Sequence, residues 1–308
     1  MNFAHDMRQA LAKRPRAIAP KYFYDAQGSA LFDQICDLPE YYPTRTETAL
    51  LRDKAAEIAA QIGPRAELVE FGAGSMTKVQ LLLDALLAAG TPAARYVPID
   101  ISGEHLNAAA LQLQRTNPGL RVEPVVADYG LPFELPPLLT GSVQRVGFFP
   151  GSTIGNYTPP DAIEFFKMAA RVLQGGALLI GADLIKEPSV LHAAYSDGQG
   201  VTAAFNLNLL ARANRELGTN FNLALFAHSA FYNAPLQRIE MHLMSLCKQS
   251  VAMDGQHFEF EEGETIHTEN SYKFTVDGLR NLAKAGGLQA GVVWTDAERR
   301  FSLHWLKT

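Results

Sequence analysis

The chain has 308 residues, which is long for one domain and sufficient for one domain with an insertion or a cap. A net charge of −5 without a run of lysine or arginine argues against nucleic acid as a partner, and no apolar stretch approaches the roughly 18–20 residues of a membrane span. Cys36 and Cys247 are isolated, and the N-terminus has no apolar signal segment. We therefore expect a cytoplasmic protein without nucleic-acid or membrane partners, with a monomer as its simplest state.

The N-terminal part is predicted to consist of short helices separated by prolines. A helix, a proline-marked linker and a second, amphipathic helix are expected at residues 2–13, 18–21 and 30–36. Prolines then bracket Tyr41 and Tyr42, which should hold both rings on a stiff, non-helical segment. Thr46 is expected to cap a helix that runs to about Gln61. The two rings either pack under a loop or form an aromatic wall over a small-molecule pocket, and periodicity does not decide between these interpretations.

From residue 67 onward, short apolar strands alternate with amphipathic helices. Strands are expected at 67–71, 95–99, 121–127, 145–149 and 177–182. Helices are expected at 78–89, 103–114 and 160–173. This alternation predicts a parallel sheet with right-handed crossovers, in which ligands bind at the carboxyl ends of the strands.

The most informative stretch is 68–78, Leu-Val-Glu-Phe-Gly-Ala-Gly-Ser-Met-Thr-Lys. A buried strand ending in Glu70 is followed by Gly72 and Gly74, which allow positive φ and a close approach of backbone to ligand at a helix N-terminus. The third glycine of the dinucleotide fingerprint is missing, because Thr77 occupies its position. A pyrophosphate needs that glycine and S-adenosylmethionine (SAM) does not. The stretch therefore favours SAM over NAD(P), with an ordinary glycine-rich turn as the third interpretation; Glu-x-Gly-x-Gly here resembles motif I of the class I methyltransferases.

Two aspartates end the next two strands of the predicted sheet. Asp100 could accept both ribose hydroxyls of an adenosine, and charge-assisted bonds of this kind contribute roughly 1.5–3 kcal/mol each. Asp128 could accept from the adenine amino group, with Tyr129 against the ring. One such aspartate could equally be a helix N-cap, but two in successive strands behind the glycine stretch favour an adenosine site.

After Asp183 the alternation ends. The segments that follow are a glycine-interrupted helix, a loop with a strand, and three antiparallel segments, at 184–217, 221–234, 238–248, 251–260 and 264–274, with a hairpin turn at Asp254-Gly255. A helix at 276–285 and a hairpin of 289–295 with 301–307 return to the sheet. With this hairpin the pattern resembles the class I SAM methyltransferases. The resemblances of this chain to known families imply an α/β fold: a doubly wound sheet with a terminal antiparallel hairpin, plus a second α+β domain that binds the substrate.

From about Lys21 to the C-terminus the chain resembles the L-histidine Nα-methyltransferase family of ergothioneine biosynthesis. The most specific segments of the resemblance are 23–28, 38–47, 151–156, 200–206, 238–241 and 268–274. It implies three methyl transfers from SAM to the α-amino nitrogen of L-histidine, which give trimethylhistidine (hercynine) and S-adenosylhomocysteine. It also implies a SAM-binding domain at 47–184 and 274–308 and a substrate-binding domain at 1–46 and 185–273.

The resemblance also assigns site residues by position. The expected SAM contacts are Gly72, Lys78, Asp100, Asp128 and Tyr129. The expected substrate residues are Asn156 and Tyr195 for the carboxylate and amino end, Met241, Glu269 and Ser271 for the imidazole, and the pocket tyrosines Tyr24 and Tyr41, which should assist transfer. Some members carry Glu-Val-Ser where this chain has Glu-Asn-Ser, but a spacing of two still places the Glu and Ser on one face of a strand and Asn270 on the other.

Methyl transfer needs a neutral amine in line with the S–CH₃ bond, and we expect orientation of that amine rather than a strong general base. The histidines form no i,i+4 ligand pair, which predicts no catalytic metal. Without the resemblance, Glu269 would more simply be a hairpin ion pair, for example with Lys273. The rival functions are methylation of another small amine or amino acid such as tryptophan, an NAD-linked oxidoreductase, and a non-catalytic SAM-binding regulator.

Overall fold

The computed structural model describes residues 3–74 and 76–308, so that Asn2 of the predicted first helix and Ser75 of the glycine stretch lie outside the described residues. The chain divides into two compact units. One comprises Met1–Tyr42 and Lys186–Tyr272, and the other comprises Pro43–Ile185 and Lys273–Thr308. The sequence-based division changes domain at 46/47, 184/185 and 273/274 instead, and its assignment of cofactor to one part and substrate to the other stays a prediction.

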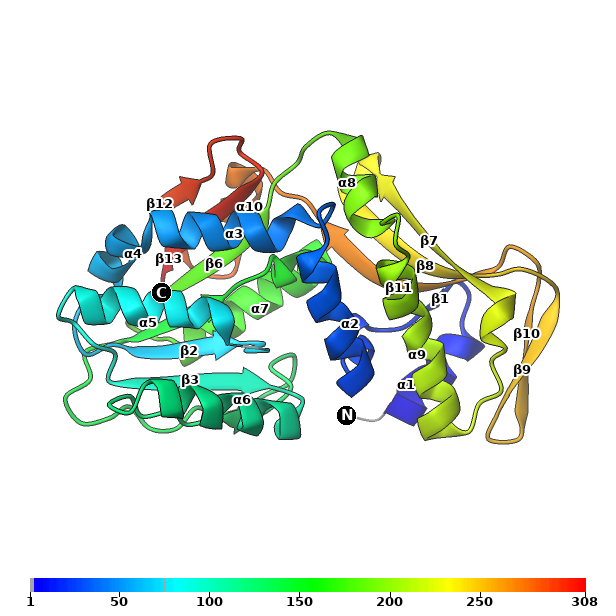
Figure 1. Ribbon diagram of the computed structural model, residues 1–308, viewed down its shortest axis with the longest axis horizontal. Helices are drawn as coiled ribbons and strands as arrows, with labels where there is room; N and C mark the ends of the chain where they lie inside the picture. The colour runs from blue at the N-terminus through cyan, green and yellow to red at the C-terminus, as the bar shows by residue number, and fades with distance from the viewer. Residues whose placement is uncertain (1–2, 75) are drawn as a thin grey trace. The chain divides into compact units, whose positions relative to one another are not determined.

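The second unit is built on a seven-stranded sheet in the order β12-β13-β6-β5-β2-β3-β4 (Figure 1). Its strands are β2 (Glu67–Phe71), β3 (Arg95–Asp100), β4 (Val125–Val126), β5 (Arg145–Phe149), β6 (Ala177–Asp183), β12 (Gln289–Thr295) and β13 (Phe301–Lys307). β13 runs antiparallel to both of its neighbours, whereas the pairs from β6 to β4 are all parallel. A parallel doubly wound sheet with one reversed strand inserted next to its edge is the class I methyltransferase arrangement, and the predicted fold class is confirmed.

Helices cover both faces of this sheet. They are α3 (Tyr42–Asp53), α4 (Ala55–Ile62), α5 (Thr77–Ala88), α6 (Gly103–Thr116), α7 (Pro159–Val172) and α10 (Val276–Ala285), with a 3₁₀ turn η2 (Thr153–Asn156). Ile58 of α4 and Val79 of α5 pack with Leu68 of β2 in one core. On the opposite face, Phe149 stacks on Phe165 of α7 with 4.4 Å between ring centroids. Among the described residues, no helix is both long and apolar enough to cross a membrane.

Two local predictions in this unit are wrong. The third strand is reduced to an isolated bridge at Val122 and the edge pair Val125–Val126, because Pro124 cannot donate to a ladder and interrupts the segment 121–127. The helix expected to start at Thr46 starts at Tyr42, since Pro43 is well tolerated in a first helical turn, and it ends at Asp53 before α4 begins. Tyr42 is therefore helical, contrary to the predicted non-helical segment.

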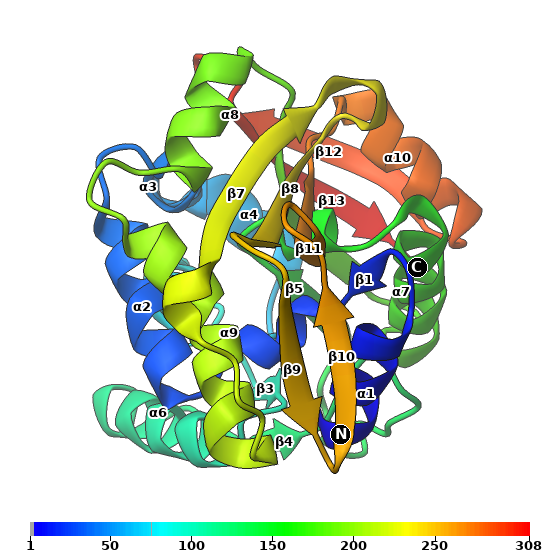
Figure 2. The same cartoon turned by 90° about the vertical axis from the view of Figure 1, so that its right-hand side faces the viewer.

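The first unit contains a four-stranded sheet, β1-β11-β8-β7, and a separate β9–β10 hairpin (Figure 2). Its strands are β1 (Arg16–Ala17), β7 (Phe226–Asn233), β8 (Arg238–Ser245), β9 (Gln249–Met253), β10 (Gln256–Phe260) and β11 (Thr265–Tyr272). Its helices are α1 (Phe3–Ala12), α2 (Ala26–Asp37), α8 (Pro188–Tyr195) and α9 (Val201–Leu217), with 3₁₀ turns η1 (Pro20–Phe23), η3 (Leu223–Leu225) and η4 (Ala234–Leu236). The predicted α+β composition and the turn at Asp254-Gly255 are confirmed.

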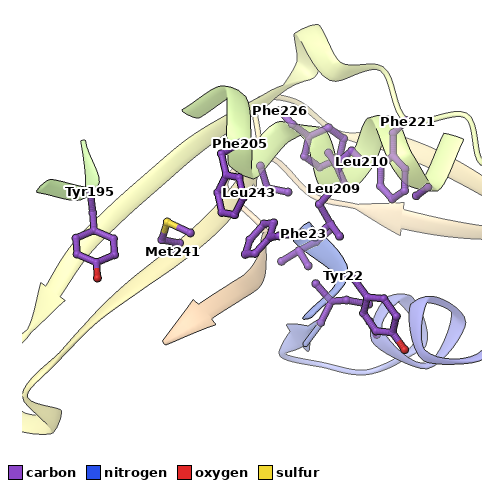
Figure 3. Packing of buried hydrophobic residues seen from close by; sticks show 14 of the residues in the cluster. Tyr22, Phe23, Tyr195, Phe205, Leu209, Leu210, Phe221, Phe226, Met241 and Leu243 are labelled. Carbon is purple, nitrogen blue, oxygen red and sulfur yellow. The ribbon is translucent and has the colours of Figure 1, made fainter. Parts of the chain in front are cut away.

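The core of the first unit lies between one face of its sheet and α2, α8 and α9 (Figure 3). Phe205, Leu209 and Leu210 of α9 pack with Met241 and Leu243 of β8, and all five are almost completely buried. One helix of this unit starts earlier than predicted. α2 begins at residue 26 rather than 30, because the Asp25 carboxylate caps it by accepting from Gly28 N (2.7 Å).

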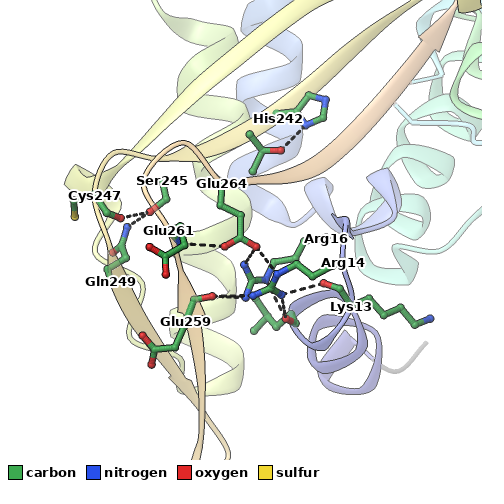
Figure 4. Close-up of polar contacts among 12 residues, drawn as sticks. Lys13, Arg14, Arg16, His242, Ser245, Cys247, Gln249, Glu259, Glu261 and Glu264 are labelled. Atoms are coloured by element: carbon green, nitrogen blue, oxygen red, sulfur yellow. Dashed lines mark hydrogen bonds and ion pairs between the residues drawn. The ribbon is translucent and has the colours of Figure 1, made fainter.

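A buried arginine ties the N-terminal segment to the late strands (Figure 4). Arg16 is 1% exposed, forms an ion pair with Glu264, and donates to the carbonyls of Glu259 (2.7 Å) and Leu11 (3.0 Å). Its guanidinium also lies 3.7 Å from the centroid of the Phe260 ring. Residues from the two ends of the sequence of this unit are therefore joined into one body, although β1 is only two residues long.

Candidate functional site

The glycine stretch forms a tight turn at the carboxyl end of β2. Gly72 and Gly74 adopt positive φ (69° and 48°), as predicted, and the N–H groups of Gly72 and Ala73 both donate to Ile99 O of β3 (2.9 and 3.1 Å). A Cβ added at Gly72 would lie 3.2 Å from the Tyr129 hydroxyl. Two of the predicted cofactor residues are thus neighbours, and the absence of a side chain at position 72 leaves room for the tyrosine.

Asp100 and Asp128 follow adjacent strands of the same sheet edge. The Asp100 carboxylate accepts from Ser102 N (2.9 Å) and that of Asp128 accepts from Gly130 N (3.0 Å). Each aspartate therefore shapes the turn that follows it. Asp100 is not the helix N-cap that the sequence left open as an alternative, because Ser102 holds the N-cap position of α6. The strand order β2-β3-β4 places Asp100 and Asp128 after the carboxyl ends of the two strands that lie next in the sheet after β2, and their contact with an adenosine stays a prediction.

Lys78 lies in the first turn of α5 and is held by a residue that sequence reasoning did not assign. Its Nζ donates to Glu47 Oε2 at 2.5 Å, and both oxygens of Glu47 lie 2.9 Å from the N–H of Gly151. Glu47 is fully buried, and a Cβ on Gly181 of β6 would come within 2.3 Å of its Oε1. A carboxylate in a space left by a glycine thus fixes both the predicted SAM lysine and the loop that leads to Asn156. The segment 38–47 is part of the family resemblance, which is a signal that it matters. The spacing of its residues does not indicate that Glu47 contacts Lys78.

Glu70, the acid of the glycine stretch, is buried at 2% exposure and shares a hydrogen bond with the Tyr96 hydroxyl. Burial raises the pKa of Glu70 to about 8; Glu47 and Asp100 nearby also raise it, while the Tyr96 bond and Lys78 act in the opposite direction. Glu70 is therefore mostly protonated at neutral pH. Its neighbour Glu47 carries the charge that balances Lys78.

Six of the predicted substrate residues belong to the first unit, where several lie in contact. The hydroxyls of Tyr195 and Ser271 share a hydrogen bond of 2.6 Å, and the ring centroids of Tyr41 and Tyr195 are 6.2 Å apart. Burial raises the pKa of Tyr41 well above its usual value, with smaller contributions from Tyr195, Cys36, Glu269 and Tyr24. Tyr41 therefore stays a neutral hydroxyl at physiological pH.

A β-bulge in β11 places Glu269 and Ser271, the residues predicted to contact the imidazole, on the same face of the sheet as Met241. His267 pairs with His242 of β8, whereas Glu269 pairs with Met241, so that Thr268 is the extra residue. In a regular strand His267 and Glu269 would share a face, but the bulge reverses the alternation and turns Glu269 to the side of Met241. Ser271 pairs with Ile239 and faces the same way, as the spacing of two predicts. Figure 3 shows Met241 and Tyr195 at the same end of this core.

Asn156 ends η2 in the second unit, after a loop in which Gly151 and Ser152 both have positive φ. The Ser152 hydroxyl accepts from Asp183 N (2.8 Å), which fastens this loop to the end of β6. Lys273, the alternative partner considered for Glu269, forms a buried ion pair with Asp183 at 2.9 Å. The shared role expected of Asn156 and Tyr195 stays a prediction.

Within the described part of the chain, one cluster has the composition of a metal site: Glu240, His242 and His267. The two imidazoles are stacked, with centroids 4.7 Å apart and planes inclined by 16°, and His242 Nε2 lies 3.1 Å from Glu240 Oε2. Nearly parallel stacked rings keep their in-plane lone pairs in two separate planes, which is a poor geometry for two imidazoles to ligate one ion. The cluster lies on the face of β8 opposite to Met241, and the predicted absence of a catalytic metal stays a prediction.

Comparison with known proteins identifies the family. The family model for SAM-dependent, histidine-specific methyltransferases matches residues 3–308. The chain is 41% identical to histidine N-alpha-methyltransferase of Mycolicibacterium smegmatis over 305 residues, 97% of this chain and 92% of that protein, and equally identical, with the same coverage, to its counterpart in Mycobacterium tuberculosis. It is also 34% identical to ergothioneine biosynthesis protein 1 of Neurospora crassa, over 95% of this chain but 33% of that longer protein. With its class I sheet and a match over nearly its whole length, the chain belongs to the SAM-dependent, histidine-specific methyltransferase family.

Proposed function

We propose that this protein is an enzyme that transfers three methyl groups from SAM to the α-amino nitrogen of L-histidine, giving trimethylhistidine (hercynine) and S-adenosylhomocysteine for ergothioneine biosynthesis. The observation that carries the proposal is the full-length family match together with the face formed by Glu269, Ser271 and Tyr195. That face combines a carboxylate with hydroxyls, which suits a ring with two nitrogens. The ergothioneine assignment draws on the name of the Neurospora relative.

The residues at the carboxyl edge of the second unit fit the cofactor. The backbone at Gly72 would approach the ligand closely, Asp100 and Asp128 would accept from ribose and adenine, and Lys78 would face the amino-acid carboxylate. When bound, SAM supplies a methyl group activated by a sulfonium. The donor set is suitable for this ligand, since two carboxylates and one ammonium complement its hydroxyls, amino groups and carboxylate.

The substrate amine must lose a proton before transfer, because an α-amino group with a pKa of about 8 is mostly protonated at neutral pH. Tyr41 cannot remove that proton as a phenolate, since burial raises its pKa well above the usual value. We assign Tyr41 and Tyr24 the task of orienting the neutral amine, with the proton passing to water. Positioning of this kind requires the reacting atoms to stand about 3–3.5 Å apart.

Selectivity is assigned to Glu269 and Ser271, which would each meet one imidazole nitrogen. A site built for two polar partners rejects an analogue that leaves them unpaired, by as much as about 10⁴-fold. Phenylalanine should therefore fail as a substrate. We also assign the enzyme to the cytoplasm, because its two cysteines form no disulfide, and we expect a monomer without nucleic-acid or membrane partners, since the net charge of −5 does not suit a nucleic acid.

The test is mass spectrometry of the purified protein incubated with SAM and each standard amino acid in turn. We expect histidine to gain one, two and three CH₂ units in sequence, and tryptophan and phenylalanine to remain unchanged. Turnover of another amino acid in preference to histidine would refute the proposal. Glu269→Ala should abolish histidine turnover while SAM still binds in calorimetry; undiminished turnover by that variant would remove the assigned role of Glu269.

A further inference from the structure

The bulge at Thr268 is held by a side chain from a different element. Thr268 is 1% exposed, and its hydroxyl donates to Asn206 Oδ1 (2.8 Å) or to Met241 O (3.0 Å). Asn206 comes from α9 and has no exposed surface. Its amide also donates to His242 O (3.0 Å), a carbonyl of β8 directly opposite the bulge. The amide therefore joins both strands at the one point where their pairing shifts.

The same amide reaches Tyr195 through a histidine. Asn206 Nδ2 lies 2.9 Å from His228 Nδ1, and His228 Nε2 lies 2.9 Å from Tyr195 O. A carbonyl can only accept, so Nε2 carries the proton and Nδ1 accepts from Asn206. Burial lowers the pKa of His228, which keeps this neutral form. All four polar side-chain atoms of Asn206 and His228 are thus hydrogen-bonded, to one another, to the Thr268 hydroxyl or to backbone carbonyls.

The segment 200–206 stood out in the sequence, yet no role was assigned to its last residue. Asn206 reaches the bulge that faces Glu269 inward, and it reaches the carbonyl of Tyr195 at the end of α8. Tyr195 in turn shares a hydrogen bond with Ser271. Two separate routes therefore lead from one buried amide to the group of side chains assigned to the imidazole and amino end.

We propose that Asn206 is a positioning residue for the substrate: it holds the Thr268 bulge and the Tyr195 carbonyl, and thereby sets the spacing of Glu269, Ser271 and Tyr195 around histidine. This inference rests on the proposed function. Asn206 itself does not touch the substrate. Loss of its hydrogen bonds changes the binding and selection of histidine and leaves the binding of SAM unchanged.

Two pairs of variants test this. Thr268→Val removes the hydroxyl but keeps the branched shape, and Thr268→Ser restores the hydroxyl. Asn206→Ala is matched by Asn214→Ala on the same helix, where the amide donates to Phe221 O (2.8 Å) and its oxygen accepts from Thr219 and Phe221, outside the substrate group. For each variant, kcat and KM are measured for histidine and for SAM, with unfolding curves alongside.

We expect Thr268→Val and Asn206→Ala to lower kcat/KM for histidine by about 10–100-fold, because a displacement near 1 Å can have an effect of this size, with the KM for SAM within about twofold of wild type. Thr268→Ser should recover most of the loss, and Asn214→Ala should lose stability only.

Equal losses in all four variants, or parallel changes in both KM values, would show a merely structural role and overturn the inference. If Asn206→Ala does not fold, the Thr268 pair decides alone. A wild-type protein that fails to methylate histidine refutes the proposed function instead, which separates the two failures.

Discussion

The protonated Glu70 predicts an unusual pH dependence of stability. Its pKa is raised to about 8 in the folded chain by burial, against an ordinary value of 4.5. Between these values the folded state retains a proton that the unfolded chain has released. Stability contributed by this group is therefore complete at low pH and is lost as pH rises toward 8. Glu70→Gln replaces the protonated acid by a neutral side chain of the same shape, which can still accept from the Tyr96 hydroxyl.

The size of the effect follows from the two pKa values. Each pH unit between them costs the wild type about 1.4 kcal/mol of unfolding free energy. From about pH 5.5 to about pH 7.5, the stability of Glu70→Gln relative to wild type should therefore rise by roughly 2–3 kcal/mol. The relevant quantity is the change in this difference with pH, since other titrating groups affect both proteins equally.

Tryptophan fluorescence can follow unfolding of the second unit, which contains Glu70, because the two tryptophans of the chain, Trp294 and Trp305, both lie in the core of that unit. Urea unfolding without SAM would be measured for both proteins across that pH range. Glu67→Gln is the matched control, because this fully buried glutamate lies on the same strand. Burial acts to raise its pKa, but the hydrogen bonds from Arg95, Leu139 N and Arg145, together with the charge of Arg95, lower it overall. Its stabilising contribution is present above the ordinary pKa, so Glu67→Gln should destabilise throughout. A Glu70→Gln difference that stays flat with pH would refute the reasoning.

Three further outcomes are expected. Glu47→Gln should raise the KM for SAM about tenfold, since Lys78 loses a charged partner, and initial rates at varied SAM would show it; an unchanged KM would contradict the pairing as a SAM determinant. Lys273→Met should lower the free energy of unfolding in urea by about 3–5 kcal/mol, because it removes the ammonium group that pairs with the buried Asp183 carboxylate; a loss of less than about 1 kcal/mol, which is typical of a surface ion pair, would count against this. Tyr24→Phe should slow at least one of the three transfers, as followed by time-resolved mass spectrometry, and identical time courses for all methylated products would remove Tyr24 from the site.

The sheet of the second unit could be predicted because its strands are short apolar runs buried on both faces and separated by helices. The one strand that failed, at 121–127, lies at the edge and contains Pro124, so its apolar residues could not form a ladder along their whole length. The predicted start of α3 was wrong for a related reason. Proline both ends extended segments and opens helices, and sequence alone does not distinguish these uses of Pro43.

In the candidate site too, residues that follow the strand pattern could be predicted, and residues that depend on tertiary contacts could not. Gly72, Asp100 and Asp128 could be identified because each follows a strand in an alternating pattern, and topology alone then brings them to one edge. Glu47 could not, because its role depends on a lysine from another helix and a space left by a glycine on another strand. Such a residue has no periodic signal of its own.

Glu269 shows most clearly where local reasoning ends. A spacing of two establishes that Glu269 and Ser271 share a face, but it cannot say which face, because every regular strand offers both. That choice is made at Thr268, where one extra residue reverses the alternation, and it depends on a hydroxyl, an amide from α9 and two carbonyls of β8. A substitution at Thr268 or Asn206 can therefore change which side chains of β11 face the core, without altering Glu269 or Ser271 themselves. Under the proposed function, this irregularity in the pairing of β11 with β8 is accordingly the first place in the chain to look for a change of substrate preference.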